Sequence, residues 1–186
     1  MQEPCSFSNS TKDYLSKFYE ILDQMILGME SACLMNSISQ NFIAQMIPHH
    51  RAAIRMSENV LKYTADTPVR RIASNIITAQ TKSISDMRAV LGSCQRMTNS
   101  CQDLRLYRRE FQNIAHAMFS QMNTAYSDND ISDNFMREMI PHHRGAIRMS
   151  ENALRYCICP KLVPILNAII TSQQQGILEM EQLLQC

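Results

Sequence analysis

Residues 41–63 read NFIAQMIPHHRAAIRMSENVLKY, and residues 134–156 read NFMREMIPHHRGAIRMSENALRY. Of these 23 positions 17 are identical, at a constant offset of 93 residues. The chain of 186 residues is therefore an internal duplication. Matched apolar positions extend both copies, so we expect two repeats, residues 12–91 and 105–184, that pack as one compact unit.

Composition and apolar spacing both indicate an all-α fold. The chain has only four glycines and six prolines, and 6% of its residues are aromatic, whereas strand-rich domains use more turn-forming and aromatic residues. Apolar residues recur at helical spacing and predict helices at residues 12–31, 38–63, 68–91, 103–124, 132–156 and 160–185. Because the links are short, we expect an up-and-down helical bundle built from two tandem three-helix repeats. Pro48 and Pro141 either bend the second helix of each repeat or mark its start.

The charge balance excludes several classes of partner. Eighteen basic and 17 acidic side chains give a net charge of +1, so no long-range field favours nucleic acid or anionic lipid. No stretch approaches the roughly 18 consecutive apolar residues that span a bilayer, and we expect no membrane insertion. Residues 1–12 are polar and lack the apolar segment of an export signal, but a removed signal replaced by an initiator Met would leave the same sequence.

Methionine and cysteine are both in excess, with 14 and seven residues. Methionine commonly fills gaps in cores, so position must decide between packing and metal binding. The offset of 93 pairs ten methionines and four of the five histidines, namely Met25 with Met118, Met29 with Met122, Met46 with Met139, Met56 with Met149, Met87 with Met180, His49 with His142 and His50 with His143. His116 has no counterpart, because Asp23 occupies its place in the first repeat.

A helical step of about 100° per residue places Met46, His49, His50 and Met56 on one face, opposite the charged residues. Burying an unpaired imidazole costs a few kcal/mol, so an inward histidine needs a hydrogen-bond partner or a metal ion. Thioethers select Cu(I) and imidazole accepts copper, whereas the carboxylates preferred by Mg, Ca or Mn are missing from this face. The pattern therefore predicts a site for Cu(I) or Ag(I) inside the bundle.

The motifs MIPHHRAAIRM at residues 46–56 and MIPHHRGAIRM at residues 139–149 resemble the signature of the family called domain of unknown function 305. The resemblance covers nearly the whole chain as two copies. It implies a ferritin-like helical bundle, and some members of the family are periplasmic copper-binding proteins of the CopM type that contribute to copper resistance. The ligands it implies are Met46, His49, His50, Met56 and Met87 in the first repeat and Met139, His142, His143, Met149 and Met180 in the second. A histidine of the family's first helix is matched by His116 but replaced by Asp23, which puts the first site in doubt, and the seven cysteines lie outside the family pattern.

We therefore expect a periplasmic or extracellular protein, not an enzyme, that sequesters Cu(I) or Ag(I) in copper tolerance or homeostasis. The further candidate ligands, besides those ten, are Met25, Met29, His116, Met118 and Met122. The alternative is a structural or protein-interaction bundle whose methionines only pack. A di-iron enzyme would need Glu-x-x-His motifs, but Glu138 precedes His142 by four residues and its counterpart is Gln45. Nucleophilic catalysis has little support, because no Cys shares a local motif with a His.

Strict alternation of six helices carries two further expectations. Each repeat should build its own methionine and histidine cluster, and the two clusters should lie in opposite halves of the bundle. The bridges expected in an oxidising compartment are Cys5 with Cys186, Cys94 with Cys101, and Cys33 with either Cys157 or Cys159. In a reducing compartment the same thiols could bind Cu(I) or Zn(II), with Cys157 and Cys159 as the first candidate pair.

Overall fold

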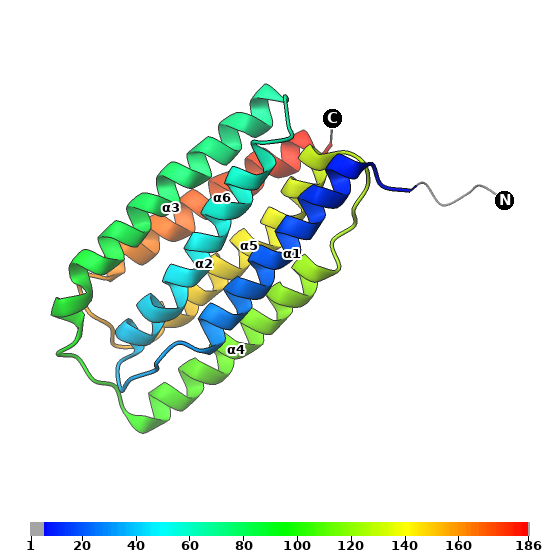
Figure 1. Ribbon diagram of the computed structural model, residues 1–186. Coiled ribbons are helices and arrows are strands. Elements are labelled where there is room, and N and C mark those ends of the chain that lie inside the picture. The colour runs from blue at the N-terminus through cyan, green and yellow to red at the C-terminus, as the bar shows by residue number, and fades with distance from the viewer. Residues whose placement is uncertain (1–5, 186) are drawn as a thin grey trace.

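The helices of the computed structural model run up and down in strict alternation (Figure 1). The structure describes residues 6–185, which contain six α-helices and no strand. The helices are α1 (Asn9–Glu30), α2 (Ile38–Val60), α3 (Thr67–Cys94), α4 (Cys101–Asn123), α5 (Ile131–Leu154) and α6 (Val163–Leu183). The predicted all-α bundle of two three-helix repeats is confirmed.

Most of the helices begin where a side-chain oxygen accepts a hydrogen bond from the first turn. Ser8 caps α1, Ser37 caps α2 and Asp66 caps α3, each accepting from the backbone N–H three residues later. Such caps satisfy N–H groups that have no partner within the helix. Helix α6 has no side-chain cap and begins at Val163, three residues later than the spacing predicted, because the chain forms a turn in which Leu162 N donates to Cys159 O.

Pro48 and Pro141 lie inside α2 and α5, so they do not mark the start of these helices. An interior proline removes one backbone hydrogen bond and crowds the preceding turn. Gly28 of α1 faces this point of α2, since a Cβ added to Gly28 would lie 2.9 Å from Pro48 Cβ. The glycine thus permits the close approach of α1 to the proline-containing part of α2.

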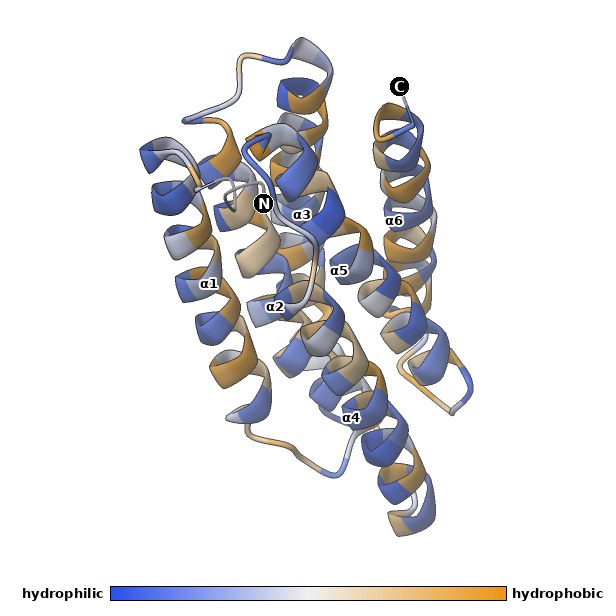
Figure 2. Ribbon diagram, turned by 90° about the vertical axis from the view of Figure 1, so that its right-hand side faces the viewer, coloured by the Kyte–Doolittle hydropathy of each residue, from blue (hydrophilic) through white to orange (hydrophobic). Residues whose placement is uncertain are grey.

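Helices α2 and α5 form the centre of the bundle. Each contacts the other two helices of its own repeat, and the two contact each other, while α3 lies beside α6 and α1 beside α4 (Figures 1 and 2). Hydrogen bonds between Ser39 and Cys159 at one end, and between Thr64 and Ser132 at the other, show that α2 and α5 are antiparallel. The middle of α2 therefore faces the middle of α5, where the two His-His pairs lie.

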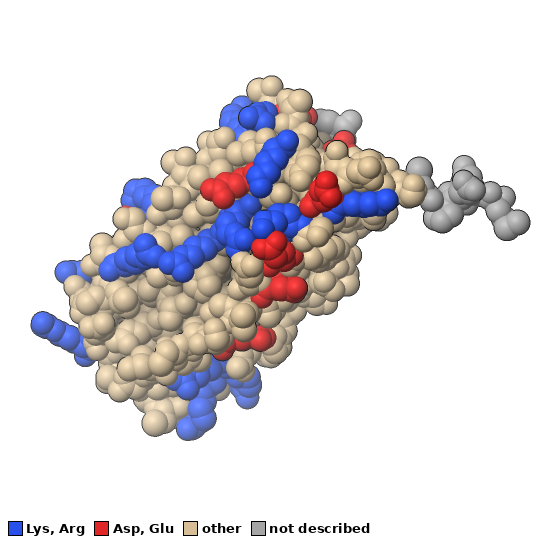
Figure 3. All heavy atoms as spheres, in the orientation of Figure 1, with Lys and Arg blue, Asp and Glu red and all other residues tan. Residues whose placement is uncertain are grey.

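The surface carries both signs of charge. On the face shown in Figure 3, Lys and Arg side chains form a band, with Asp and Glu side chains beside it. Figure 2 shows apolar residues on one side of each helix and polar residues on the other. Among residues 6–185 no helix combines the length and apolarity that crossing a membrane requires.

Candidate metal centre

The four paired histidines meet at the centre of the bundle. His49, His50, His142 and His143 are at most 1% exposed. The ring centroids of His49 and His142 lie 3.7 Å apart with an interplanar angle of 31°, and each ring is within 6 Å of its chain neighbour's ring, at 5.8 Å and 5.9 Å. The two repeats therefore contribute to one quartet of imidazoles.

Few of the ring nitrogens in this quartet have partners. His142 Nε2 lies 3.2 Å from the carbonyl oxygen of His49, so this nitrogen carries the proton and donates. His50 Nε2 lies 3.0 Å from Ser83 Oγ. Both nitrogens of His49, and Nδ1 of each of the other three, are buried without a hydrogen-bond partner. A neutral imidazole has one protonated nitrogen and one nitrogen with a free lone pair, and the latter can bind a metal ion.

Burial keeps these imidazoles neutral. Desolvation lowers the pKa of His50 to about 3 and that of His142 to about 4. The pKa values of His49 and His143 also lie well below the usual value, first because of burial and then because the neighbouring imidazoles would repel a second positive charge. At neutral pH no proton competes with a metal ion for these nitrogens.

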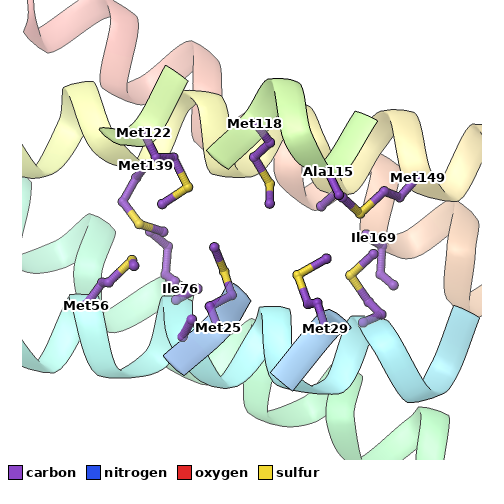
Figure 4. Close-up of a cluster of buried hydrophobic side chains, with 14 of the residues drawn as sticks. Met25, Met29, Met56, Ile76, Ala115, Met118, Met122, Met139, Met149 and Ile169 are labelled. Carbon is purple, nitrogen blue, oxygen red and sulfur yellow. The ribbon is translucent and has the colours of Figure 1, made fainter. Parts of the chain in front are cut away.

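The paired methionines are buried as well. The candidate methionines are each at most 2% exposed, and they are Met25, Met29, Met46, Met56, Met87, Met118, Met122, Met139, Met149 and Met180. Figure 4 labels Met25, Met29, Met56, Met118, Met122, Met139 and Met149 of this cluster, and Met25 and Met118 lie between the other two groups of labelled methionines. All ten paired methionines belong to one buried core cluster, and the four histidines are buried in the same bundle.

The expectation of two separate clusters, one built by each repeat, is wrong. The histidines of both repeats stack on each other, and Figure 4 groups Met56 of the first repeat with Met122 and Met139 of the second. The reason is the antiparallel packing of α2 on α5, which places residues after His49 beside residues before His142. Each half of the bundle therefore contains methionines from both repeats.

His116 does not join this core. Its side chain is 68% exposed, and Nε2 lies 3.9 Å from Glu30 Oε1 on the surface. A small cavity between α1 and α4 is lined by both of these residues and by Met29, and none of the four paired histidines lines it. Among the described residues, no group of three or more His, Cys, Asp or Glu side chains is arranged to hold a metal ion.

Glu138 is a buried carboxyl group that the sequence interpretation considered only as part of an absent di-iron motif. It is 2% exposed, its Oε2 accepts a hydrogen bond of 2.5 Å from the Tyr14 hydroxyl, and its Oε1 has no partner. Burial raises the pKa of Glu138 to about 8, although the hydrogen bond from Tyr14 acts in the opposite direction. The available signal was its position on the buried face of the helix, one turn before His142.

The cysteines pair differently from the expected scheme. Cys94 forms a disulfide with Cys159, with the Cα atoms 5.2 Å apart, and Cys33, Cys101 and Cys157 are free and exposed. The expected bridges Cys94 with Cys101 and Cys33 with Cys157 or Cys159 are therefore wrong. The prediction that these five cysteines gather at one end of the bundle is confirmed. The pairing differs because the end of α3 lies against the link between α5 and α6, and not against the link between α3 and α4. The expected pair of Cys5 and Cys186 lies outside the described residues.

Comparisons with known proteins match this arrangement to one family. A family model described as Domain of unknown function (DUF305) matches residues 39–184. The solved structure of CopM in its Ag-bound form is 28% identical with a TM-score of 0.58, covering 81% of this chain and 97% of that chain. CopM in its Cu(II)-bound form is also 28% identical, with a TM-score of 0.58 over 79% of this chain and 95% of that chain.

Two further relatives were matched, one by its structure and one over a short stretch of sequence. A DUF305 fragment from Deinococcus radiodurans is 24% identical with a TM-score of 0.58, covers 79% of this chain and 95% of that chain, and supports the fold. An uncharacterized protein of Acanthamoeba polyphaga mimivirus is 35% identical over 52 residues, which is 28% of this chain. The match spans about a third of that viral protein, 34% of its length.

Proposed function

Because this chain belongs to the DUF305 family, we propose that it binds soft monovalent metal ions, Cu(I) or Ag(I), in its core and sequesters them without catalysing a reaction. The observation that supports this most is the set of five buried ring nitrogens without partners, together with ten buried methionines in the same bundle. Buried polar atoms without hydrogen-bond partners destabilise a fold. Their presence here is explained if a ligand binds to them. Thioether and neutral imidazole together are the donor set that Cu(I) and Ag(I) prefer.

The methionine side chains also supply the movement that binding requires. A thioether side chain has three rotatable bonds and a polarizable sulfur, so it can turn towards an ion while the helices stay in place. Met25 and Met118 lie between the two groups of methionines in Figure 4, and both belong to the same buried core cluster. We propose that a bound ion is coordinated by these sulfurs together with ring nitrogens of His49 and the neighbouring histidines.

The relatives and the disulfide support a role in metal handling outside the reducing cytosol. CopM has been solved with Ag and with Cu(II), which makes metal binding a reasonable property to propose here. Disulfides persist in oxidising compartments such as the periplasm or the extracellular space, and Cys94 and Cys159 form one. We propose that this protein works in such a compartment, in copper tolerance or homeostasis.

The experiment that tests this function is a competition titration with a chromogenic Cu(I) chelator, repeated with Ag(I). We expect stoichiometric binding that withstands the chelator. A variant with Met25, Met29, Met46 and Met87 all replaced by Leu should bind the ion at least tenfold more weakly. Leu and Met have similar volumes, so each replacement should cost less than about 1.5 kcal/mol of unfolding free energy.

Met35→Leu is the matched control, because Met35 is 50% exposed and lies outside the core. This variant should bind Cu(I) as the natural protein does. If the natural protein fails to compete for Cu(I) and Ag(I), or if the quadruple variant competes equally well, the methionines only pack. The protein would then be a structural or protein-interaction bundle.

A further inference from the structure

Three links between helices meet at one end of the bundle, which we call the thiol end. They are residues 31–37, 95–100 and 155–162. Asn99 holds them together, because its backbone N donates to Asn36 O at 2.9 Å and its Nδ2 donates to Cys157 O at 2.7 Å. Three free, exposed cysteines lie in these links or directly after them, namely Cys33, Cys101 and Cys157. The thiol end thus presents three thiols to solvent.

These thiols do not react with one another in the folded protein. The other two cysteines of this end, Cys94 and Cys159, form a disulfide and are at most 3% exposed, while the three exposed thiols are free. Within residues 6–185 no three His, Cys, Asp or Glu side chains are arranged to hold a metal ion, so the three thiols form no such site together. They also lack counterparts in the duplication, where the equivalent residues are Tyr126, Ser8 and Thr64. A reaction of these thiols therefore needs a reactant from outside this end of the bundle.

The thiol end is positively charged. With two helical turns on either side of each link, it comprises residues 24–45, 87–108 and 147–170, which contain seven basic and three acidic side chains, a net charge of +4. The opposite end, counted in the same way over residues 6–16, 53–74, 116–138 and 176–185, contains six basic and nine acidic side chains, a net charge of −3. Figure 3 shows Lys and Arg side chains at the end where α4 begins. The near-neutral chain is therefore divided into a basic and an acidic end.

Cys101 has the best-defined charged neighbour. It is the first residue of α4, and Arg105 follows it by four residues, so their Cβ atoms lie about 5–6 Å apart on the same face of the helix. Both residues are exposed. The carboxylate nearest in sequence is Asp103, whose Oδ2 accepts a hydrogen bond from Ser100 Oγ at 2.8 Å. Residues two apart on a helix do not face each other, so Arg105 and not Asp103 is the charged neighbour of Cys101.

Arginines also accompany the other two thiols. Arg108 Nη2 donates to Met35 O at 2.8 Å, which places this guanidinium beside the link that contains Cys33. Arg155 precedes Cys157 by two residues and is exposed. An anion that approaches any of the three thiols therefore meets a positive side chain close by.

We propose that the exposed cysteines of the thiol end react with small anionic disulfides and become mixed disulfides with an anionic thiol. The cysteine thiolate attacks one sulfur of the small disulfide, a bond between the two sulfurs forms, and the original S–S bond breaks. The other half leaves as a thiolate and takes up the proton that the cysteine released. The cysteine is oxidised and the leaving half is reduced, so no further oxidant is needed. This reaction does not depend on metal binding in the core.

Charge selects this reactant over a second copy of the chain. A disulfide between two copies would bring two basic ends together, and their like charges repel. A small anionic disulfide is attracted instead, and it reaches each exposed thiol without requiring the links to move. The buried disulfide of Cys94 and Cys159 takes no part.

The test compares the rates at which oxidised glutathione, an anionic disulfide, and cystamine, a cationic one, modify the protein at low salt. Cys5→Ser and Cys186→Ser are present in every sample, and mass spectrometry of peptides gives the rate at each remaining thiol. Arg105→Gln should slow the reaction of oxidised glutathione at Cys101 about threefold, the effect of one unit charge at about 6 Å in water. It should speed the reaction of cystamine at the same thiol. Both effects should largely vanish in about 1 M NaCl, where the Debye length is about 3 Å.

Two matched variants serve as controls. Arg105→Lys keeps the positive charge and should restore the natural rates at Cys101. Arg71→Gln removes an exposed arginine from the opposite end of the bundle, in the first turns of α3, and should leave every rate unchanged.

Equal rates of oxidised glutathione at Cys101 in Arg105→Gln and Arg105→Lys would overturn the proposal. Disulfide-linked dimers, or bridges between two of the three cysteines, in place of mixed disulfides would also overturn it, as would the absence of any adduct. If circular dichroism shows that Arg105→Gln is unfolded, the natural protein decides the question. A rate with oxidised glutathione that does not fall as salt is added would then overturn the proposal.

Discussion

His49 and His142 occupy equivalent positions 93 residues apart in sequence, and their rings stack at 3.7 Å in the centre of the bundle. His142 Nε2 donates to the backbone carbonyl of His49, so the side chain of His49 takes no part in this hydrogen bond. Both ring nitrogens of His49 are consequently buried without a partner. His49 is therefore the histidine whose side chain contributes least to the stability of the metal-free fold.

Replacing His49 by Leu should raise the unfolding free energy of the metal-free protein. Leu removes the two unpartnered nitrogens and leaves the bond from His142 to the backbone of residue 49 intact, so we expect a gain of about 1–3 kcal/mol. The same variant should lose most of the stabilisation that Ag(I) confers on the natural protein. Urea unfolding with and without Ag(I) measures both effects. A His49→Leu protein that is less stable without metal would contradict the view that the imidazole is retained for binding.

Much of the fold and part of this site could be predicted from the sequence because helical periodicity is a local property. The repeated motif places Met46, His49 and His50 on one face of a helix, and that face is buried as expected. Short links imposed the alternation of the helices, which is observed. The residues that would bind metal were accessible to this reasoning because it needs only the angle per residue along one helix.

The relations between the repeats could not be predicted in the same way. Stacking of His49 on His142 depends on how α2 crosses α5, and nothing within one helix specifies this register. The disulfide of Cys94 with Cys159 has the same origin, since several cysteines lie at one end and only tertiary packing selects the pair. The buried, unpartnered amides of Gln80 and Gln173 could not be predicted, because a glutamine on a helix face gives no signal until its tertiary surroundings are known.

The stability of the protein should fall as the pH rises from 6.5 to 9, because of Glu138. Its pKa is about 8 in the folded protein against 4.5 for a free carboxyl group, so the folded state binds the proton more tightly. The associated stability is complete below pH 4.5 and is lost as the pH rises through 8. Between pH 6.5 and 8 this amounts to about 2 kcal/mol, at about 1.4 kcal/mol per pKa unit.

Glu138→Gln is the comparison variant, because Gln resembles the protonated carboxyl group and stands at the equivalent position, Gln45, in the first repeat. It should lack this loss between pH 6.5 and 9 in urea unfolding experiments. The histidines act below this range, since their lowered pKa values reduce stability only as the pH falls below 6.5. A natural protein and a variant with parallel pH profiles would show that Glu138 is ionised in the fold.

Removing the disulfide should destabilise the protein substantially. Cys94 and Cys159 are 65 residues apart, and a cross-link that closes a loop of this length stabilises a fold by about 4 kcal/mol in the chain-entropy account. We expect the double variant Cys94→Ala, Cys159→Ala to unfold at a lower urea concentration, with an unfolding free energy that is lower by about 4 kcal/mol. Alkylation of the natural protein without reduction, followed by peptide mapping, should label Cys33, Cys101 and Cys157. Labelling of Cys94 before reduction would contradict the pairing.

Gly28 and Gly92 should respond in opposite directions to replacement by alanine. A Cβ at Gly28 would lie 2.9 Å from Pro48 Cβ, and the proline ring cannot turn away as a flexible side chain can, so α1 must move from α2. We expect Gly28→Ala to cost about 1–3 kcal/mol of unfolding free energy, as overpacked cores do. Gly92 is an exposed residue of α3 with nothing within 4 Å of an added Cβ, and alanine there should stabilise by about 0.5–1 kcal/mol. Thermal unfolding of both variants measures the difference, and a Gly28→Ala protein as stable as Gly92→Ala would show that α1 does not approach α2 this closely.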